Sequence, residues 1–173
     1  MKESSILEIV RAIDPANAEY IMQNEEIVGT FCRAAEYMRK GRADMAAWVF
    51  KEAKEKVAQF GEHYLTPANI QVGDGVTVNL WSDRYAATVI KVTKSSVTVR
   101  RDKATLNPDF KPEFIPGGFA AHCTNQEEQS YTYEPDESGT VYTFRWSNKY
   151  QRYGQPGNLS LSKGRHEFYD YNF

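Results

Sequence analysis

A group of charged and aromatic residues in the second half of the chain could bind an anionic partner. Arginine presents a planar pair of N–H donors to phosphate or carboxylate, and tryptophan presents a flat face on which a base can stack. The candidate ligand-binding or partner-binding residues are Trp81, Asp83, Arg84, Arg100, Arg101, Asp102, Lys103, His122, Arg165 and His166. Together they could hold a nucleotide, a nucleic-acid strand or an acidic protein loop.

The alternative interpretation of the same residues is structural. Trp81 would then belong to the core, and the charged side chains would be solvated or form ordinary ion pairs. The expected pairs are Asp83 with Arg84 and Arg101 with Asp102.

Catalytic and metal-binding patterns are weak in this sequence. The possible soft metal ligands lack the CxxC or HxxxH spacing of a zinc site; they are His63, His122, His166, Cys32 and Cys123. Cys123, His122 and Asp102 could act as nucleophile, base and acid, but no nucleophile elbow or cysteine signature surrounds them. We therefore expect a protein that is not an enzyme and that uses no metal or cofactor.

The segment Gly73-Asp74-Gly75 is better explained as a turn than as a phosphate loop. It lacks the Gly-Lys-Ser/Thr that completes such a loop, and it precedes a predicted strand rather than a helix.

Charge and hydropathy favour a globular protein without a large electrostatic field. The 173 residues are 41% hydrophobic and carry a formal net charge of −2. Residues 1–71 contain 9 basic and 11 acidic residues, and residues 72–173 contain 12 of each. This balance argues against a protein that coats DNA nonspecifically.

Compartment and membrane contact can also be predicted. Two cysteines far apart in the sequence, Cys32 and Cys123, favour reduced thiols in a cytosol. No apolar run approaches the ~18 residues that span a bilayer, and the N-terminal residues do not resemble a signal peptide. We therefore expect a cytoplasmic protein with no membrane partner.

Hydrophobic residues three and four apart predict helices over residues 4–65. Ser4 or Ser5 is expected to cap the first helix, and Asp14-Pro15 is expected to begin a short second one.

Two longer helices should follow, over residues 25–40 and 44–60, with Gly41 and Gly61 at their ends. The side chains expected on their buried sides include Ile27, Val28, Phe31, Ala34, Ala35, Met38, Met45, Trp48, Val49, Ala53 and Val57. The pair resembles one hairpin of a tetratricopeptide repeat. Because such units need about three repeats for stability, a plain antiparallel hairpin is the favoured interpretation.

From Val72 the hydrophobic period changes to two, which indicates strands. Residues 72–104 predict three consecutive antiparallel strands, with a bulge at Ile90-Lys91 and a hairpin turn at residues 94–96. Short strands joined in this way are typical of a small SH3-like barrel.

Residues 105–129 are rich in proline and glycine and predict a long irregular loop. Further strands are expected at residues 131–134, 141–147 and 166–173, with turns at 136–139 and 153–157. The expected fold is therefore α+β. A helical domain, residues 1–68, precedes an antiparallel β-domain, residues 72–173, that forms an SH3-like barrel or a curved sheet.

The second half of the chain contains the segments WSDRYAATVIKVTK, VTVRRDKA, PGGFAAHCTNQ and GRHEFYDYNF. Over residues 72–173 it resembles a widespread family of small uncharacterised bacteriophage and prophage proteins. The resemblance implies a phage origin and the cytoplasm of a host cell, and it brings no activity with it.

Three functions remain open at this point. The leading hypothesis is a phage accessory protein that binds and inhibits or sequesters a host component, either a defence effector protein or its nucleotide signal. Trp81, Asp83, Arg84, Arg101 and Arg165 would make this contact, with the loop at 105–129 as a lid or contact arm. The less favoured alternatives are a nucleic-acid-binding SH3-like module and a phage assembly protein that forms a homo-oligomer.

Overall fold

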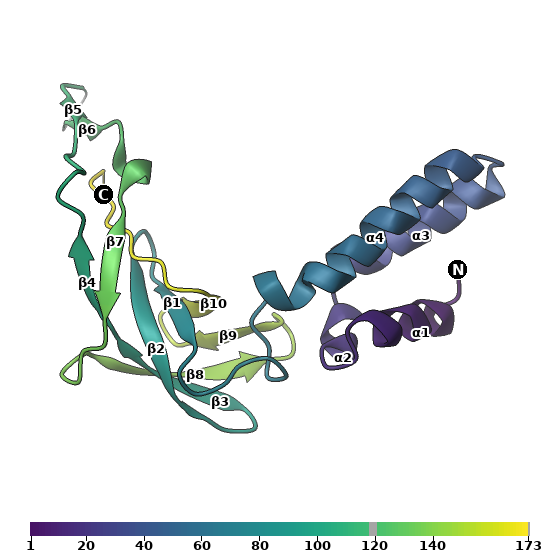
Figure 1. Ribbon diagram of the computed structural model, residues 1–173, viewed down its shortest axis with the longest axis horizontal. Helices are drawn as coiled ribbons and strands as arrows, with labels where there is room; N and C mark the ends of the chain where they lie inside the picture. The colour runs from purple at the N-terminus through teal and green to yellow at the C-terminus, as the bar shows by residue number, and fades with distance from the viewer. Residues whose placement is uncertain (118–120, 173) are drawn as a thin grey trace. The chain divides into compact units, whose positions relative to one another are not determined.

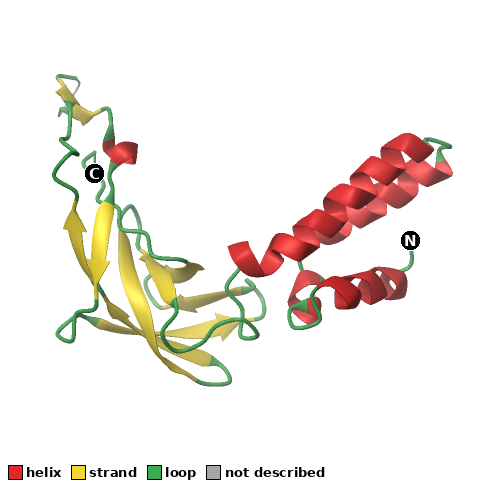
Figure 2. Ribbon diagram, viewed as in Figure 1, coloured by secondary structure: helices red, strands yellow, loops and turns green. Residues whose placement is uncertain are grey.

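The chain folds into two compact units of different class. The computed structural model describes residues 1–117 and 121–172, which divide into the units Met1–Asn69 and Ile70–Phe173. The first unit is helical, and the second is built of β-strands (Figure 2). The predicted α+β class is therefore confirmed.

The helical unit is built around an antiparallel hairpin of two long helices (Figure 1). Its helices are α1 (Glu3–Ile13), α2 (Ala18–Ile21), α3 (Glu25–Arg39) and α4 (Ala43–His63). Asn24 caps α3, because its side-chain Oδ1 accepts a hydrogen bond of 3.1 Å from the backbone N–H of Ile27. Gly41, at φ +71°, provides the left-handed residue between α3 and α4.

Three predicted helix boundaries were wrong. α1 begins at Glu3, and neither Ser4 nor Ser5 caps it. Asp14 does not begin a helix; its carboxylate accepts bonds from the backbone N–H and the side-chain amide of Asn17, at 3.1 and 2.9 Å. α4 continues through Gly61 to His63 because its buried face extends to Phe60.

Two residues expected in the helical core are exposed. Met38 and Trp48 are 60% and 62% exposed, whereas Phe31 and Val49 are buried. α4 buries Ala46, Val49, Ala53, Val57 and Phe60, and this spacing of three and four leaves position 48 on the opposite side.

The β unit contains a closed six-stranded antiparallel barrel with the strand order β1-β10-β9-β8-β3-β2 (Figure 1). Its strands are β1 (Gly75–Asn79), β2 (Arg84–Val92), β3 (Ser96–Arg101), β8 (Val141–Ser147), β9 (Arg152–Gln155) and β10 (Leu159–Lys163). The core side chains include Val76, Val78, Val89, Val97, Val99, Phe144 and Tyr153. Closure leaves the barrel without the unpaired edges of an open sheet.

The predicted details of the first three strands are confirmed. A register shift between Val89 and Lys91 marks the expected bulge in β2. The chain turns between Val92 and Ser96, where Thr93 and Ser96 bond each other, and Gly73 lies in a turn before β1.

The described part of residues 105–129 is mostly irregular, as predicted, but short paired strands interrupt it. β4 (Lys103–Leu106) pairs with β7 (Tyr131–Glu134), and β5 (Phe114–Ile115) pairs with β6 (His122–Cys123). A short 3-10 helix, Gln126–Glu128, follows. We call residues 103–134 the arm, since they extend from the barrel in Figure 1. Residues 118–120 lie outside the described part.

The C-terminal strand prediction was also wrong. Residues 165–172, here called the tail, form only one isolated bridge, between Phe168 and Arg84. The closing strands are β9 and β10. β9 occupies most of the predicted turn at 153–157, and the chain turns at residues 156–158 instead. Phe173 lies outside the described residues.

Candidate functional site

The tail binds several of the residues predicted to bind a ligand. Arg165 donates from Nε to Oδ2 of Asp102 at 2.8 Å and from Nη2 to the hydroxyl of Thr88 at 2.8 Å. That hydroxyl donates to Oδ1 of Asp102 at 2.7 Å. The Asp102 side chain is only 3% exposed, so Arg165 and Thr88 satisfy a buried carboxylate.

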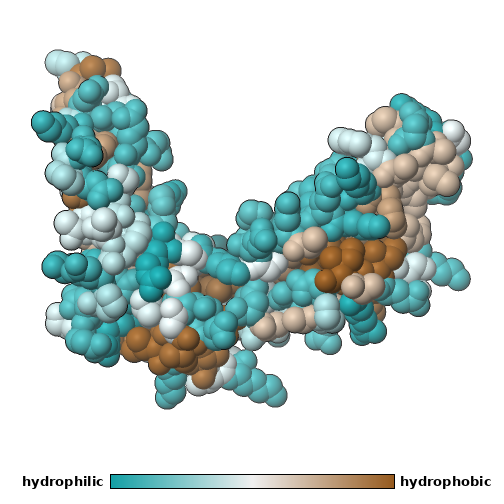
Figure 3. Space-filling view, in the orientation of Figure 1, coloured by the Kyte–Doolittle hydropathy of each residue, from teal (hydrophilic) through white to brown (hydrophobic). Residues whose placement is uncertain are grey.

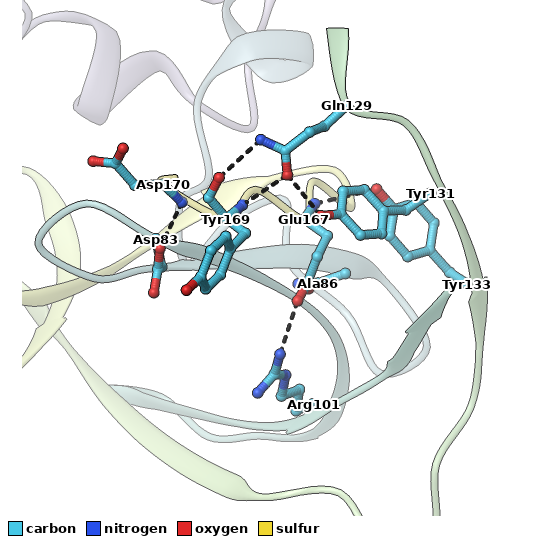
Figure 4. Close-up of polar contacts among 9 residues, drawn as sticks. All are labelled: Asp83, Ala86, Arg101, Gln129, Tyr131, Tyr133, Glu167, Tyr169 and Asp170. Carbon is cyan, nitrogen blue, oxygen red and sulfur yellow. Dashed lines mark hydrogen bonds and ion pairs between the residues drawn. The ribbon is translucent and has the colours of Figure 1, made fainter. Parts of the chain in front are cut away.

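Glu167 forms a second buried contact of the tail (Figure 4). Its two carboxylate oxygens accept from the backbone N–H of Ala86 at 2.7 Å and from Nη2 of Arg101 at 2.8 Å. The Arg101 guanidinium also lies 3.6 Å from the centroid of the Tyr85 ring. Arg101 is therefore held by protein groups on two sides.

Gln129 and Asp83 hold the next residues of the tail (Figure 4). The Gln129 side chain accepts from the backbone N–H of Tyr169 at 3.1 Å and donates to its carbonyl at 2.8 Å. Asp83 accepts from the backbone N–H of Asp170 at 2.9 Å. Tyr131 donates to Gln129 at 2.7 Å, and burial, aided by nearby acidic groups, raises the pKa of Tyr131 to about 12.

The remaining predicted cations also have neighbours within the chain. Arg84 Nη1 lies 3.1 Å from Nε2 of His166, and its guanidinium lies over the Phe168 ring. Arg100 pairs with Glu137, and Lys103 pairs with Glu134 at 3.4 Å.

The expected ion pairs, Asp83 with Arg84 and Arg101 with Asp102, are not the contacts observed. The partners of Arg101 and Asp102 are Glu167 and Arg165, and Asp83 bonds the tail backbone rather than Arg84. Trp81 is not in the core, since it is 84% exposed.

The possible triad is not assembled. His122 and Cys123 lie in β6 at the end of the arm, far from the β3–β4 junction that holds Asp102 (Figure 1). Cys123 is buried, and its backbone N–H donates to Asn172 at 2.7 Å. Within residues 1–117 and 121–172, no group of three His, Cys, Asp or Glu residues is placed to hold a metal ion.

The barrel strands themselves have an unusual charge composition. The six strands contain no Asp or Glu and seven basic residues: Arg84, Lys91, Arg100, Arg101, Arg145, Arg152 and Lys163. The acidic residues of the unit lie in its turns, arm and tail. The barrel strands themselves therefore contribute only positive charge.

One side of the barrel remains uncovered by the tail. Along β8, Val141, Thr143 and Arg145 are exposed, whereas the alternate residues are more buried. Across β2, β3 and β8, Lys91 pairs with Thr98 and Thr98 with Thr143. Two residues further along β8, Arg145 pairs with Ser96 of β3 and with Gly154 of β9. Ser147 of β8 pairs with Arg152 of β9. We call this surface of β2, β3, β8 and β9 the open face.

The turn between β8 and β9 adds an aromatic ring to the open face. Tyr150 is 62% exposed. Lys149 Nζ and the Arg152 guanidinium lie 5.1 and 5.7 Å from the centroid of its ring. The two cations hold the ring at the surface while leaving most of it accessible.

The cations of the open face differ from most of the predicted ones in having no acidic partner among the described residues. Of the predicted arginines and lysine, Arg84 alone also lacks one, and it contacts His166 and Phe168. The ion pairs in the described part of the β unit use Arg100, Arg101, Lys103 and Arg165. None of these pairs includes the four cations of the open face, which are Lys91, Arg145, Lys149 and Arg152.

Sequence reasoning missed this surface because it averaged charge over the whole second half. Residues 138–166 contain five basic residues, five aromatic residues and no acid, whereas residues 104–137 contain seven acids and one lysine. Cations interleaved with aromatics over 29 residues are the sequence pattern that could have located the open face.

Fold and site thus define a small β-barrel protein with one basic, aromatic outer face. No family model, curated protein or solved structure matches the chain in the comparisons made with each. Among the described helices, none combines the length and apolar character needed to cross a membrane.

Proposed function

We propose that this protein is a binding protein and that the open face of its barrel binds a single strand of nucleic acid. The observation that carries the proposal is the set of four cations without carboxylate partners, two of which lie beside the exposed Tyr150. Cations that no internal acid neutralises are the ones available to phosphate groups.

The layout of the open face suits an extended strand better than a single nucleotide. Arg145 and Arg152 are diagonal neighbours on adjacent strands, a relation that places Cα atoms about 7–8 Å apart. Lys91 lies two strands away from β8, so the positive charge follows a line across the sheet. A phosphate backbone could follow this line.

Tyr150 would contact a base rather than a phosphate. Unpaired bases expose their faces, and stacking on an aromatic ring is the usual way in which proteins bind them without reading sequence. Small hydroxyl side chains between the cations, such as Thr98, Thr143 and Ser147, leave the surface flat and offer further donors to phosphate oxygens.

The proposal can be tested by fluorescence anisotropy with a labelled single-stranded DNA of mixed sequence. We expect Arg145→Gln combined with Arg152→Gln to weaken binding by at least ~10-fold, because two phosphate contacts are lost. Lys103→Gln is the matched control, since Lys103 also carries one positive charge but pairs with Glu134. Equal binding by the wild type and the double variant would refute the proposal.

A second candidate function rests on Trp81. An indole that is 84% exposed in the turn after β1 is a suitable anchor for a protein partner. This observation supports the hypothesis of a phage protein that binds and sequesters a host component. Native mass spectrometry of the wild type and of Trp81→Ala, each purified from host cells, tests it: a protein retained by both forms would argue against Trp81 as the anchor.

The SH3-like description of the barrel belongs to the same proposal. Short antiparallel strands, a bulge in β2 and closure by β10 against β1 support it. Small barrels of this kind bind ligands on their outer strands and loops.

A further inference from the structure

The helical unit contains an apolar groove that the barrel proposal does not use. It lies between α3 and α4 on either side of Gly41 and has a volume of about 380 Å³. Met1, Met38, Phe50 and five alanines line it. Figure 3 shows apolar surface on the helical unit in this region.

The groove is open because the side chains at this end of the hairpin are small or flexible and do not fill the space between α3 and α4. The well-packed core of the unit joins α1 to Phe31, Ala53 and Val57, and all three are buried. Beyond them Ala47 is exposed, and Met38 is 60% exposed. Methionine and alanine form a surface that can adapt to an inserted apolar side chain.

The charge around the groove identifies the kind of partner. Residues 32–54, which contain both groove-lining helix segments, carry six basic and three acidic residues. The rest of the helical unit carries three basic and eight acidic residues. The helical unit therefore has opposite net charges in its two parts, and the groove lies in the positive one.

Individual contacts place this positive charge near the groove. Lys54 Nζ lies 5.5 Å from the centroid of the Phe50 ring, which is part of the groove lining. Arg42 directly precedes Ala43, which lines the groove, and its guanidinium lies 5.5 Å from the centroid of the Tyr37 ring. Ion pairs occupy Glu36 with Lys40, Lys51 with Glu55 and Glu52 with Lys56. The charged residues of segment 32–54 that form none of the described ion pairs are four basic ones and one acid: Arg33, Arg39, Arg42, Lys54 and Asp44.

We propose that this groove binds one amphipathic helix of a partner protein, with apolar residues at i, i+3/i+4 and i+7 and with acidic residues beside them. A helix laid in a groove between two helices buries one apolar stripe and leaves its flanking residues at the rim. Acidic flanks would meet the basic rim, and this complementarity would select the partner.

Two synthetic helical peptides test the proposal on the full chain. Both carry the same leucine stripe; one has glutamate flanks and the other lysine flanks. By isothermal titration calorimetry, we expect the glutamate peptide to bind and the lysine peptide to bind at least ~10-fold more weakly, because one flank attracts the rim and the other is repelled. Equal binding by both, or binding by neither, would overturn the proposal.

A pair of variants locates the binding. Ala47→Glu places a carboxylate in the groove, and we expect it to weaken binding of the glutamate peptide at least ~10-fold. Ala58→Glu makes the same change at an exposed position of α4 outside the groove and should bind as the wild type does. Equal affinity of Ala47→Glu and the wild type would show that the peptide binds elsewhere.

A second copy of the chain could cover the groove instead. If light scattering showed a dimer for the wild type and a monomer for Ala47→Glu, the groove would bind a second copy of the chain and the proposed partner helix would be wrong. A monomer in both cases agrees with the proposal.

Discussion

Two faces of one barrel use the same residue type in opposite ways. Where the tail crosses the barrel, Arg101 and Arg165 each bind a buried carboxylate at 2.8 Å. On the open face, Arg145 and Arg152 are exposed and have no acidic partner among the described residues. All four arginines lie in or next to barrel strands that contain no acid of their own.

The difference between the faces comes from the tail and the β3–β4 junction. Glu167 and Asp102, whose side chains are 9% and 3% exposed, need positive partners to offset the cost of burial. The arginines that meet this need stabilise the fold. The open face receives no such acid, so no carboxylate of the described residues neutralises its four cations.

The largest effect that separates the two faces should be on stability. Glu167→Ala removes an acceptor from the backbone N–H of Ala86 and leaves Arg101 without its carboxylate. We expect urea unfolding to show a loss of about 2–3 kcal/mol, at the lower end for a broken buried pair because Arg101 is partly exposed.

Glu134→Ala is the control for this measurement. It breaks the exposed pair with Lys103 and should change the free energy of unfolding by less than about 0.5 kcal/mol. Similar losses for both variants would show that the tail contact is no stronger than a surface ion pair.

On the open face the largest single effect should come from the aromatic ring. Tyr150→Ala should weaken binding of single-stranded DNA by about 1–3 kcal/mol, as removal of a stacking ring does. Tyr150→Phe keeps the ring face and should bind almost normally. If anisotropy shows equal losses for both variants, the hydroxyl rather than the ring makes the contact.

One exchange of variants compares the faces directly. Arg165→Gln should lower the free energy of unfolding by about 1–2 kcal/mol, because it removes a charged partner of Asp102, and should leave DNA binding unchanged. Arg152→Gln should weaken DNA binding by up to about 1 kcal/mol and change stability by less than about 0.5 kcal/mol. Urea unfolding measures the stability change of each variant, and anisotropy measures its change in DNA binding. If Arg165→Gln weakened DNA binding and Arg152→Gln lowered stability, the roles assigned to the two faces would be wrong.

A smaller effect concerns the pH dependence of the tail contact. The pKa of Tyr131 is raised from 10.0 to about 12 in the folded protein. The stability linked to its proton is therefore complete below about pH 10 and is lost as the pH rises to about 12. Over this range, the melting temperature of the wild type should fall more steeply with pH than the melting temperature of Tyr131→Phe. Parallel curves would show that Tyr131 titrates normally.

Local patterns in the sequence predicted local structure well. The alternation in residues 72–104 predicted β1, β2 and β3, and the phase slip at Ile90-Lys91 predicted the bulge. Spacing of three and four predicted α3 and α4, although it did not predict that Trp48 faces away from the core.

Contacts between distant segments could not be predicted in the same way. β9 and β10 contain polar residues and glycine, and they are strands because neighbours on both sides supply their hydrogen bonds. The tail has the aromatic composition of a strand, but side chains outside it, including Arg101, Gln129 and Asp83, bind its residues. Which cation meets an acid depends on this path, so the sequence alone could not separate the paired arginines from the unpaired ones.

The salt dependence of binding tests the central claim most directly. For single-stranded DNA, each phosphate contact contributes about −0.7 to the slope of log Kobs against log salt concentration. Four cations on the open face predict a slope of about −2 to −3, and loss of Arg145 and Arg152 together should reduce its magnitude by about 1.4. The Lys103→Gln control should keep the wild-type slope. The same slope in the wild type and in the double variant would contradict the claim that the open face binds the phosphate backbone.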